Sequence, residues 1–270
     1  MKRPALLLFI LTCTSLIFLR SSATENLQKK LKKEGYVYIP SGTVQDQGND
    51  KSIQGFYISS TEVSNAQYRE FLSDLKKQGR WEEYNIALID SNKWSDIFTY
   101  SEPFVNYYGS HPAYDNYPVV NVSYAGATMY CAWLTEKYAA MGYHVCVRLP
   151  VKLEWIYAAQ GGHPENEYAW NGNYMRNKKG AYLCNFKDTT GFYSEIALIT
   201  APQKSFVPND YGIYNMCGNV AEMLMEEGAH KGGSWHTGIE FVSIHAPDPY
   251  AGISTASPFI GFRPVISVVE

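Results

Sequence analysis

One stretch of the sequence, NDYGIYNMCGNVAE at residues 209–222, restricts the local structure more than any other. Within it Asn215, Gly218, Val220 and Glu222 follow one another at intervals of 3, 2 and 2 residues. A tight loop with this spacing can direct a side-chain amide oxygen, two backbone carbonyls and a carboxylate toward one point. Calcium accepts such all-oxygen ligand sets, because its coordination geometry is flexible. The spacing therefore predicts a calcium site at these four residues.

A purely structural interpretation of the same loop is also open. Gly218 can supply a positive φ, which glycine adopts without steric cost. Asn215 can cap a turn through its side chain, and Glu222 can be solvated. The spacing alone does not choose between the two interpretations.

The composition predicts one domain that does not bind nucleic acid. The chain has 270 residues, of which 46% are apolar and 18% are charged, so it can bury one sizeable core and needs no second domain. Its net charge of -3 provides no basic face for a phosphate backbone. The basic run KKLKK at residues 29–33 is too short to change this conclusion.

The N-terminal residues 1–23 have the features of an export signal. Two basic residues precede an apolar stretch, Pro4 to Leu19, that is too short for a stable membrane span, and small residues follow at 21–23. We expect cleavage after Ala23. The alternative is a lipoprotein signal with lipid attached at Cys13, because the preceding Ile-Leu-Thr is similar to a lipobox. In either case we expect an exported protein, in the periplasm or associated with the outer membrane.

Two helices are indicated by apolar residues at helical spacing. Ser64 and Gln67 form a capping box at the start of the first, which ends before Gly79. The second extends over residues 123–141. A third is expected after Pro150, where Val151 at the N-cap position cannot accept a hydrogen bond through its side chain, at a cost of ~1 kcal/mol.

Short strands and loops are predicted for the rest of the chain. Residues 24–35 read as a charged connector, helical or frayed. Strands are expected at residues 36–43, 55–59, 119–122 and 145–149. Residues 80–116 show little periodicity and are expected to be a long irregular segment. The pattern as a whole is typical of an α+β fold with short strands and long loops.

Several ordered motifs resemble those of the formylglycine-generating enzyme family, the sulfatase-modifying-factor domain. These are YVYIPSGT at residue 36, GFYISSTEVSNAQYREF at 55, YPVVNVSYAGATMYCAWL at 117, VRLPVKLEWIYAAQGG at 147, the loop at 209–222, KGGSW at 231 and GFR at 261. The resemblance covers residues 36–270 as one domain. It implies the C-type-lectin-like fold of that family, with two to three helices and loops held by structural calcium.

The resemblance also indicates which residues would bind calcium. The family's second calcium loop falls on Asn215, Gly218, Val220 and Glu222. Its first site opens on Asn185 and the carbonyl of Phe186, but a later aspartate of that site is replaced by Thr190. A hydroxyl does not supply the charge of a carboxylate, so this first site should be weaker unless Asp188 substitutes.

The chemistry of the active family members depends on two cysteines that bind Cu(I) through soft thiolates. Those positions hold Thr237 and Val242 here, and no cysteine follows Cys217 anywhere in the chain. We therefore expect no copper and no catalytic residue. The six histidines show no metal-binding helix spacing.

A narrower resemblance suggests where the protein acts. SEPFVNYYGSHPAYDNYPVV at residue 101 and YAWNGNYMRNKKGAYLCNFK at 168 are similar to the GldJ- and GldK-type gliding-motility lipoproteins of the type IX secretion apparatus. This implies an exported, non-catalytic scaffold or binding component whose partners are envelope or secretion-machinery proteins. The alternatives are an oxidase that converts a sulfatase cysteine to formylglycine, and a module that binds carbohydrate or peptide.

Four cysteines follow the export signal, at positions 131, 146, 184 and 217. In an oxidising compartment they could form one or two disulfides, and all three pairings remain open. Cys131 lies on a predicted core stripe, where a small buried thiol is the ordinary interpretation.

Overall fold

The computed structural model describes residues 25–188 and 198–269. The chain divides into two units with the boundary between Tyr36 and Val37, and each is considered by itself. In the first unit, residues 25–33 form a helix, so the expected connector is helical. Residues 1–23, with Cys13 and the expected cleavage site, lie outside the described residues. No helix in the described part is long and apolar enough to cross a membrane.

The larger unit contains three small sheets. The first has the strand order β1-β4-β9-β5, formed by Tyr36–Ile39, Phe56–Ser59, Val265–Val268 and Val145–Arg148. Strand β9, near the C-terminus, pairs antiparallel with both β4 and β5. The expected strands at residues 55–59 and 145–149 are thus confirmed, and the end of the chain joins them into one sheet.

The strand expected at residues 36–43 is in fact divided. Strand β1 ends at Ile39, and β2, Gly42–Asp46, forms a separate hairpin with β3, Asn49–Ile53. The two-residue turn between them has positive φ at both Gln47 and Gly48, the geometry that matches the twist of paired strands. The sequence analysis missed this hairpin, because Gln47 is not a residue that usually marks such a turn.

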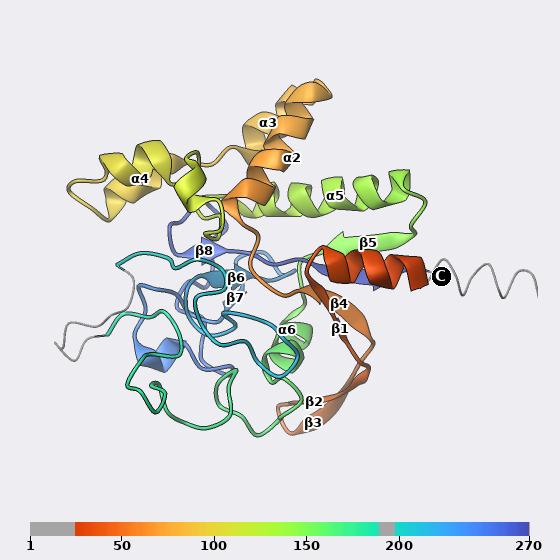
Figure 1. The fold of residues 1–270 in the computed structure, drawn as a ribbon, viewed down its shortest axis with the longest axis vertical. Coiled ribbons are helices and arrows are strands. Elements are labelled where there is room, and N and C mark those ends of the chain that lie inside the picture. The colour runs from red at the N-terminus through yellow and green to blue at the C-terminus, as the bar shows by residue number, and fades with distance from the viewer. Residues whose placement is uncertain (1–24, 189–197, 270) are drawn as a thin grey trace, which may run out of the picture. The chain divides into compact units, whose positions relative to one another are not determined.

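The third sheet brings together three motifs that are far apart in the sequence. It has the order β7-β6-β8, formed by His230–Lys231, Ala221–Met223 and Ile260–Gly261. Glu222 pairs with Lys231 on one side and with Gly261 on the other. The end of the 209–222 loop, the start of KGGSW and the start of GFR therefore lie side by side (Figure 1).

The predicted helices are present. Helix α2, Asn65–Lys77, begins with the expected capping box: Gln67 N donates to Ser64 Oγ over 3.2 Å and Ser64 N donates to Gln67 Oε1 over 2.9 Å. Helix α5, Tyr124–Ala140, lies beside β5 (Figure 1). Helix α6, Lys152–Ala159, lacks a side-chain cap at Val151, as expected.

The prediction of an irregular segment at residues 80–116 was wrong. The structure places α3, Trp81–Ala87, and α4, Glu102–Tyr107, in this region, with 3-10 turns at Ser91–Asp96 and Pro112–Tyr114. A further 3-10 turn, η3, covers Ile239–Phe241. Helices α3 and α4 are too short to show a full apolar repeat. Aromatic packing around the buried Trp94 stabilises this region, with Phe104 and Tyr108 in ring contact with it.

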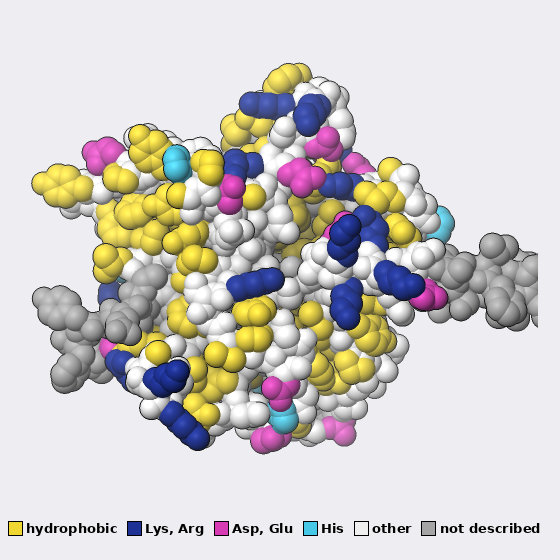
Figure 2. Space-filling view, viewed as in Figure 1, with side chains coloured by type: hydrophobic (Ala, Val, Ile, Leu, Met, Phe, Trp, Pro, Cys, Tyr) yellow, Lys and Arg dark blue, Asp and Glu magenta, His cyan; other side chains and the backbone are white. Residues whose placement is uncertain are grey.

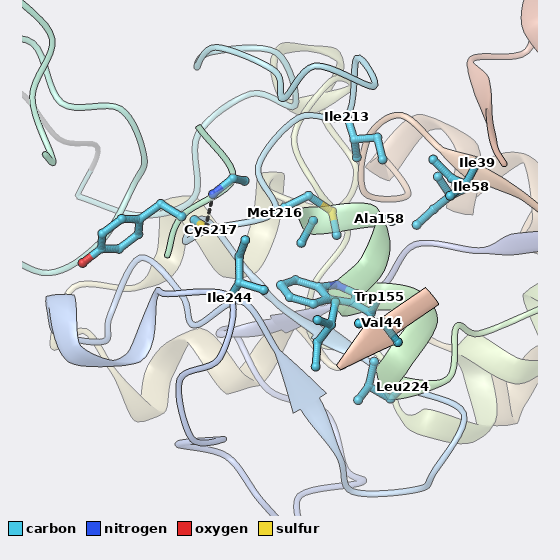
Figure 3. Close-up of a cluster of buried hydrophobic side chains, with 14 of the residues drawn as sticks. Ile39, Val44, Ile58, Trp155, Ala158, Ile213, Met216, Cys217, Leu224 and Ile244 are labelled. Atoms are coloured by element: carbon cyan, nitrogen blue, oxygen red, sulfur yellow. Dashed lines mark hydrogen bonds between the residues drawn. The ribbon is translucent and has the colours of Figure 1, made fainter. Parts of the chain in front are cut away.

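The main core surrounds α6. Trp155 is fully buried, and Figure 3 shows its ring beside Met216 from the 209–222 loop and Ile244 from the segment after KGGSW. Cys217 lies in the same core and accepts a hydrogen bond from Ala169 N over 3.4 Å. The loops of the C-terminal half are thus held by a helix from the middle of the chain.

Candidate functional site

The 209–222 loop is positioned by its own asparagines. Asn209 Oδ1 accepts hydrogen bonds from Tyr211 N and Ile213 N, which closes the first turn. Asn215, Gly218 and Asn219 all have positive φ, at 56°, 75° and 66°. A Cβ on Gly218 would lie 2.3 Å from the carbonyl oxygen of Asn185, so only glycine fits there. The structural role considered for Gly218 is therefore present.

A buried carboxylate that the sequence analysis did not single out lies beneath this loop. Glu62, just before α2, is fully buried. It accepts hydrogen bonds from Asn215 Nδ2 over 3.1 and 3.2 Å and from Asn219 Nδ2 over 2.8 Å. Burial raises the pKa of Glu62 to about 7, while the nearby Arg263 acts in the opposite direction. In the sequence, only the position of Glu62 next to the apolar Val63 could have indicated that this carboxylate is buried.

Glu222 is fully buried in an ion pair with Arg263 from the GFR motif. Arg263 Nε donates to Glu222 Oε2 over 2.7 Å, and Arg263 Nη2 donates to Oε1 over 2.6 Å. Trp155 Nε1 also donates to Glu222 Oε2 over 2.8 Å. The carboxylate is thus neither solvated nor free, and the arginine connects the 209–222 loop to the last strand of the chain.

The residues expected to bind calcium divide into two groups. Asn215 Oδ1 and Asn185 Oδ1 are buried oxygens that have no hydrogen-bond partner among the described residues. Such atoms are costly unless a cation or water completes them, so both suit a calcium ligand. Glu222, by contrast, already accepts three hydrogen bonds. A calcium ion at Glu222 would have to compete with Arg263.

The first expected calcium site is described only in part. Asn185 Nδ2 donates to Ile199 O over 2.8 Å, and the side chain of Phe186 is buried in the main core. Thr190 lies outside the described residues. Asp188, the expected substitute, accepts a hydrogen bond from the Tyr182 hydroxyl.

The two positions that correspond to the copper-binding cysteines are both inside the protein. Thr237 Oγ1 accepts from Ser234 N over 2.8 Å and donates to Ser234 O over 3.0 Å. Val242 is fully buried in the main core. A hydroxyl tied to the backbone and a branched hydrocarbon leave no soft ligand for Cu(I) at these positions.

Two of the cysteines, Cys184 and Cys217, lie in the main core. All four described cysteines are free thiols. Burial raises the pKa of Cys184 and of Cys217, so both favour the protonated thiol over the metal-binding thiolate. His236 stacks instead on Phe259, with 4.7 Å between ring centroids. The described residues contain no group of three or more His, Cys, Asp or Glu side chains that could hold a metal ion.

An apolar surface lies over α4. Figure 2 shows hydrophobic side chains gathered there. Tyr100 is 84% exposed and Tyr107 is 52% exposed, whereas Tyr108 is buried and donates its hydroxyl proton to Pro118 O over 2.7 Å.

Comparison with curated proteins finds formylglycine-generating enzymes and inactive relatives among similar sequences. The formylglycine-generating enzyme of Mus musculus is 27% identical over 198 residues, which are 63% of this chain and 49% of the relative. The inactive C-alpha-formylglycine-generating enzyme 2 of Bos taurus is also 27% identical, over 195 residues that cover 63% of this chain and 60% of the relative. The chain thus spans about half to three fifths of the length of these curated relatives.

Solved structures show the same fold. The crystal structure of CarF superposes with a TM-score of 0.60 and 19% identity, covering 87% of this chain and 98% of that one. The family model for the sulfatase-modifying factor enzyme 1-like domain matches residues 21–268. The chain therefore belongs to the sulfatase-modifying factor enzyme 1-like domain family.

Proposed function

We propose that this protein is a non-catalytic member of the family, exported from the cytoplasm, and that it acts as a scaffold or binding component. The observation that carries the proposal is the pair of buried residues, Thr237 and Val242, at the positions of the copper-binding cysteines. The family also contains relatives named as inactive, such as the bovine protein above. A framework that keeps the fold but lacks the thiolates can still present a surface to a partner.

The partners that we propose are proteins of the cell envelope or of the secretion machinery. Support comes from the export-signal features of residues 1–23 and from the resemblance of two segments to the gliding-motility lipoproteins of the type IX system. The exposed Tyr100 and Tyr107 supply aromatic area of the kind that is enriched at protein interfaces. The same aromatics would suit the alternative, a module that binds carbohydrate or peptide.

An activity assay separates this proposal from the oxidase alternative. The purified chain is incubated with Cu(I) and a peptide that contains CxPxR, and the peptide is analysed by mass spectrometry for loss of the thiol and gain of an aldehyde. We expect no aldehyde, because two soft ligands are missing. Aldehyde formation that requires copper would refute the proposal. A known formylglycine-generating enzyme run in parallel is the positive control.

A crosslinking experiment tests the binding role directly. The tagged protein is crosslinked mildly in its native cells, and the captured proteins are compared between wild type and a Tyr100→Ser/Tyr107→Ser double variant. We expect envelope proteins that are captured by the wild type and lost in the variant. Recovery of the wild type as an uncrosslinked monomer in every cell fraction would contradict a scaffold role.

We also propose a structural calcium ion at the 209–222 loop. The support is the partnerless, buried Asn215 Oδ1, together with the spacing of Gly218, Val220 and Glu222. The partnerless Asn185 Oδ1 supports a second ion with the carbonyl of Phe186 as a further ligand. Asn has an uncharged oxygen that calcium accepts readily.

A chelator distinguishes calcium from the ion pair as the element that holds the loop. The melting temperature is measured in calcium buffer and after addition of a calcium chelator, for wild type and for Asn215→Ser. We expect the chelator to lower the melting temperature of the wild type, and to have a smaller effect on the variant. If the wild type is unaffected, no calcium is bound there, and the Glu222–Arg263 pair and the asparagine hydrogen bonds suffice to hold the loop.

A further inference from the structure

A cavity opens beside the third sheet, and none of the residues considered above for copper or calcium lines it. Its volume is about 610 Å³, within the range of small-molecule sites. Its walls come from the β2–β3 turn, the start of α6, strand β7 and the segment 245–252. Four basic side chains line it: Lys152, His230, Lys231 and His245.

Lys231 is a buried amine that forms no ion pair with a carboxylate of the described residues. Lys231 as a whole is only 6% exposed. Its Nζ donates to Ala246 O over 2.8 Å and lies 5.8 Å from the centroid of the Trp155 ring. No carboxylate among the described residues lies within 4.0 Å of this nitrogen. A buried ammonium without a counter-charge is unfavourable, and burial accordingly lowers the pKa of Lys231 to about 8.

Two further basic side chains line the same cavity. Lys152 is the first residue of α6 and lines the cavity together with His245. Lys152 adds to the lowering of the pKa of Lys231, and both lysines lower the pKa of His245, although burial is the larger cause for each. The three side chains come from a strand, a helix and a loop. They therefore bring two lysine side chains and one imidazole to the wall of the same cavity.

The nearby carboxylate, Asp248, is already committed elsewhere. Its Oδ2 accepts from His230 N over 2.7 Å and is 3.2 Å from His230 Nδ1, and its Oδ1 accepts from Tyr250 N over 2.8 Å. It favours the charged form of Lys231 only through longer-range attraction. Three other acidic residues, Asp46, Glu226 and Glu227, line the cavity, and they disfavour a ligand with many negative charges.

We propose that this cavity binds a small organic molecule with one oxyanion group, a carboxylate or a phosphate, and that Lys231 holds this group with Lys152 and His245 beside it. An anion there supplies a counter-charge for Lys231, whose own burial limits the screening of the attraction by water. The remainder of the cavity accommodates the body of the ligand. This inference does not depend on whether the protein has lost its oxidase chemistry.

Calorimetric titration with inorganic phosphate and with butyrate, a monocarboxylate, at constant ionic strength set by chloride, tests the site. We expect saturable binding of at least one probe, and an affinity at least tenfold lower in Lys231→Met. Lys231→Arg keeps the positive charge and should keep binding, which separates loss of the site from loss of folding. Lys179→Met, an exposed lysine outside the cavity, is the matched control and should bind as the wild type does.

The two probes distinguish the chemical source of the oxyanion. Binding of phosphate but not butyrate assigns a phosphate-bearing ligand, and binding of butyrate but not phosphate assigns a carboxylate. Binding of both probes supports an oxyanion site that accepts either phosphate or carboxylate. Failure of both probes to bind, or equal binding to wild type and Lys231→Met, would overturn the proposal.

Discussion

The substitution Arg263→Met tests how much the buried ion pair contributes to stability. Arg263 is fully buried and pairs with Glu222, and it also donates to Ser59 O over 3.0 Å and to Tyr214 O over 2.7 Å. Methionine fills much of the same volume but removes the charge and all of these hydrogen bonds. Glu222 would keep only the hydrogen bond from Trp155. Glu62, which lies nearby, would lose the positive charge that favours its ionised form.

The expected loss is large compared with the stability of a typical domain. Removing one partner of a buried pair costs ~3–5 kcal/mol, because the remaining charge is left uncompensated. The free energy of unfolding of a domain is only about 5–15 kcal/mol, so the variant should lose a large fraction of its stability. The double variant Arg263→Met/Glu222→Leu leaves no unpaired charge at this position and should recover part of the loss.

Urea denaturation followed by far-UV circular dichroism measures these differences. The control is Arg80→Met, because Arg80 also contacts two carboxylates, Glu83 and Glu136, but lies near the surface. Its loss should lower the free energy of unfolding by less than ~1 kcal/mol. If Arg263→Met costs no more than Arg80→Met, the buried pair is not a main source of stability and the reasoning is refuted.

Three further predictions concern a titrating group, a thiol and a helix start. Because the folded-state pKa of Glu62 is raised from 4.5 to about 7, the free energy of unfolding should fall by roughly 3 kcal/mol as the pH rises through this window. In urea titrations at pH 5 and pH 8, Glu62→Gln should remove this dependence of the free energy of unfolding on pH. The exposed Cys146 should react with a thiol reagent in the native state while buried Cys131 reacts only on unfolding, so Cys146→Ser should lose one rapidly reacting thiol. Val151→Thr supplies the missing cap of α6 and should raise the free energy of unfolding by ~1 kcal/mol, as measured by urea denaturation; no gain would show that the bond from Val151 N to Glu154 Oε2 already suffices.

The sequence determined the two longest helices and the start of a third by local rules. The capping box at Ser64 and the apolar repeat after it fixed α2, and the same reasoning located α5 and the uncapped start of α6. Ordered motifs indicated the family, which the match over residues 21–268 confirmed. The two replaced positions, 237 and 242, were also read from the sequence, because the identity of a metal ligand is a property of a single residue.

The tertiary structure decided what the charged residues do. The sequence spacing that suggested a calcium carboxylate at Glu222 contains no information about Arg263, which lies 41 residues away and reaches it only when β6 and β8 pair. The same holds for Glu62 beneath the asparagines, and for Lys231 without a carboxylate partner within reach. Whether a buried charge is paired depends on groups from distant segments. The strength of the attraction is set by the distance between the charges in space and by how far water is excluded, and not by separation along the chain.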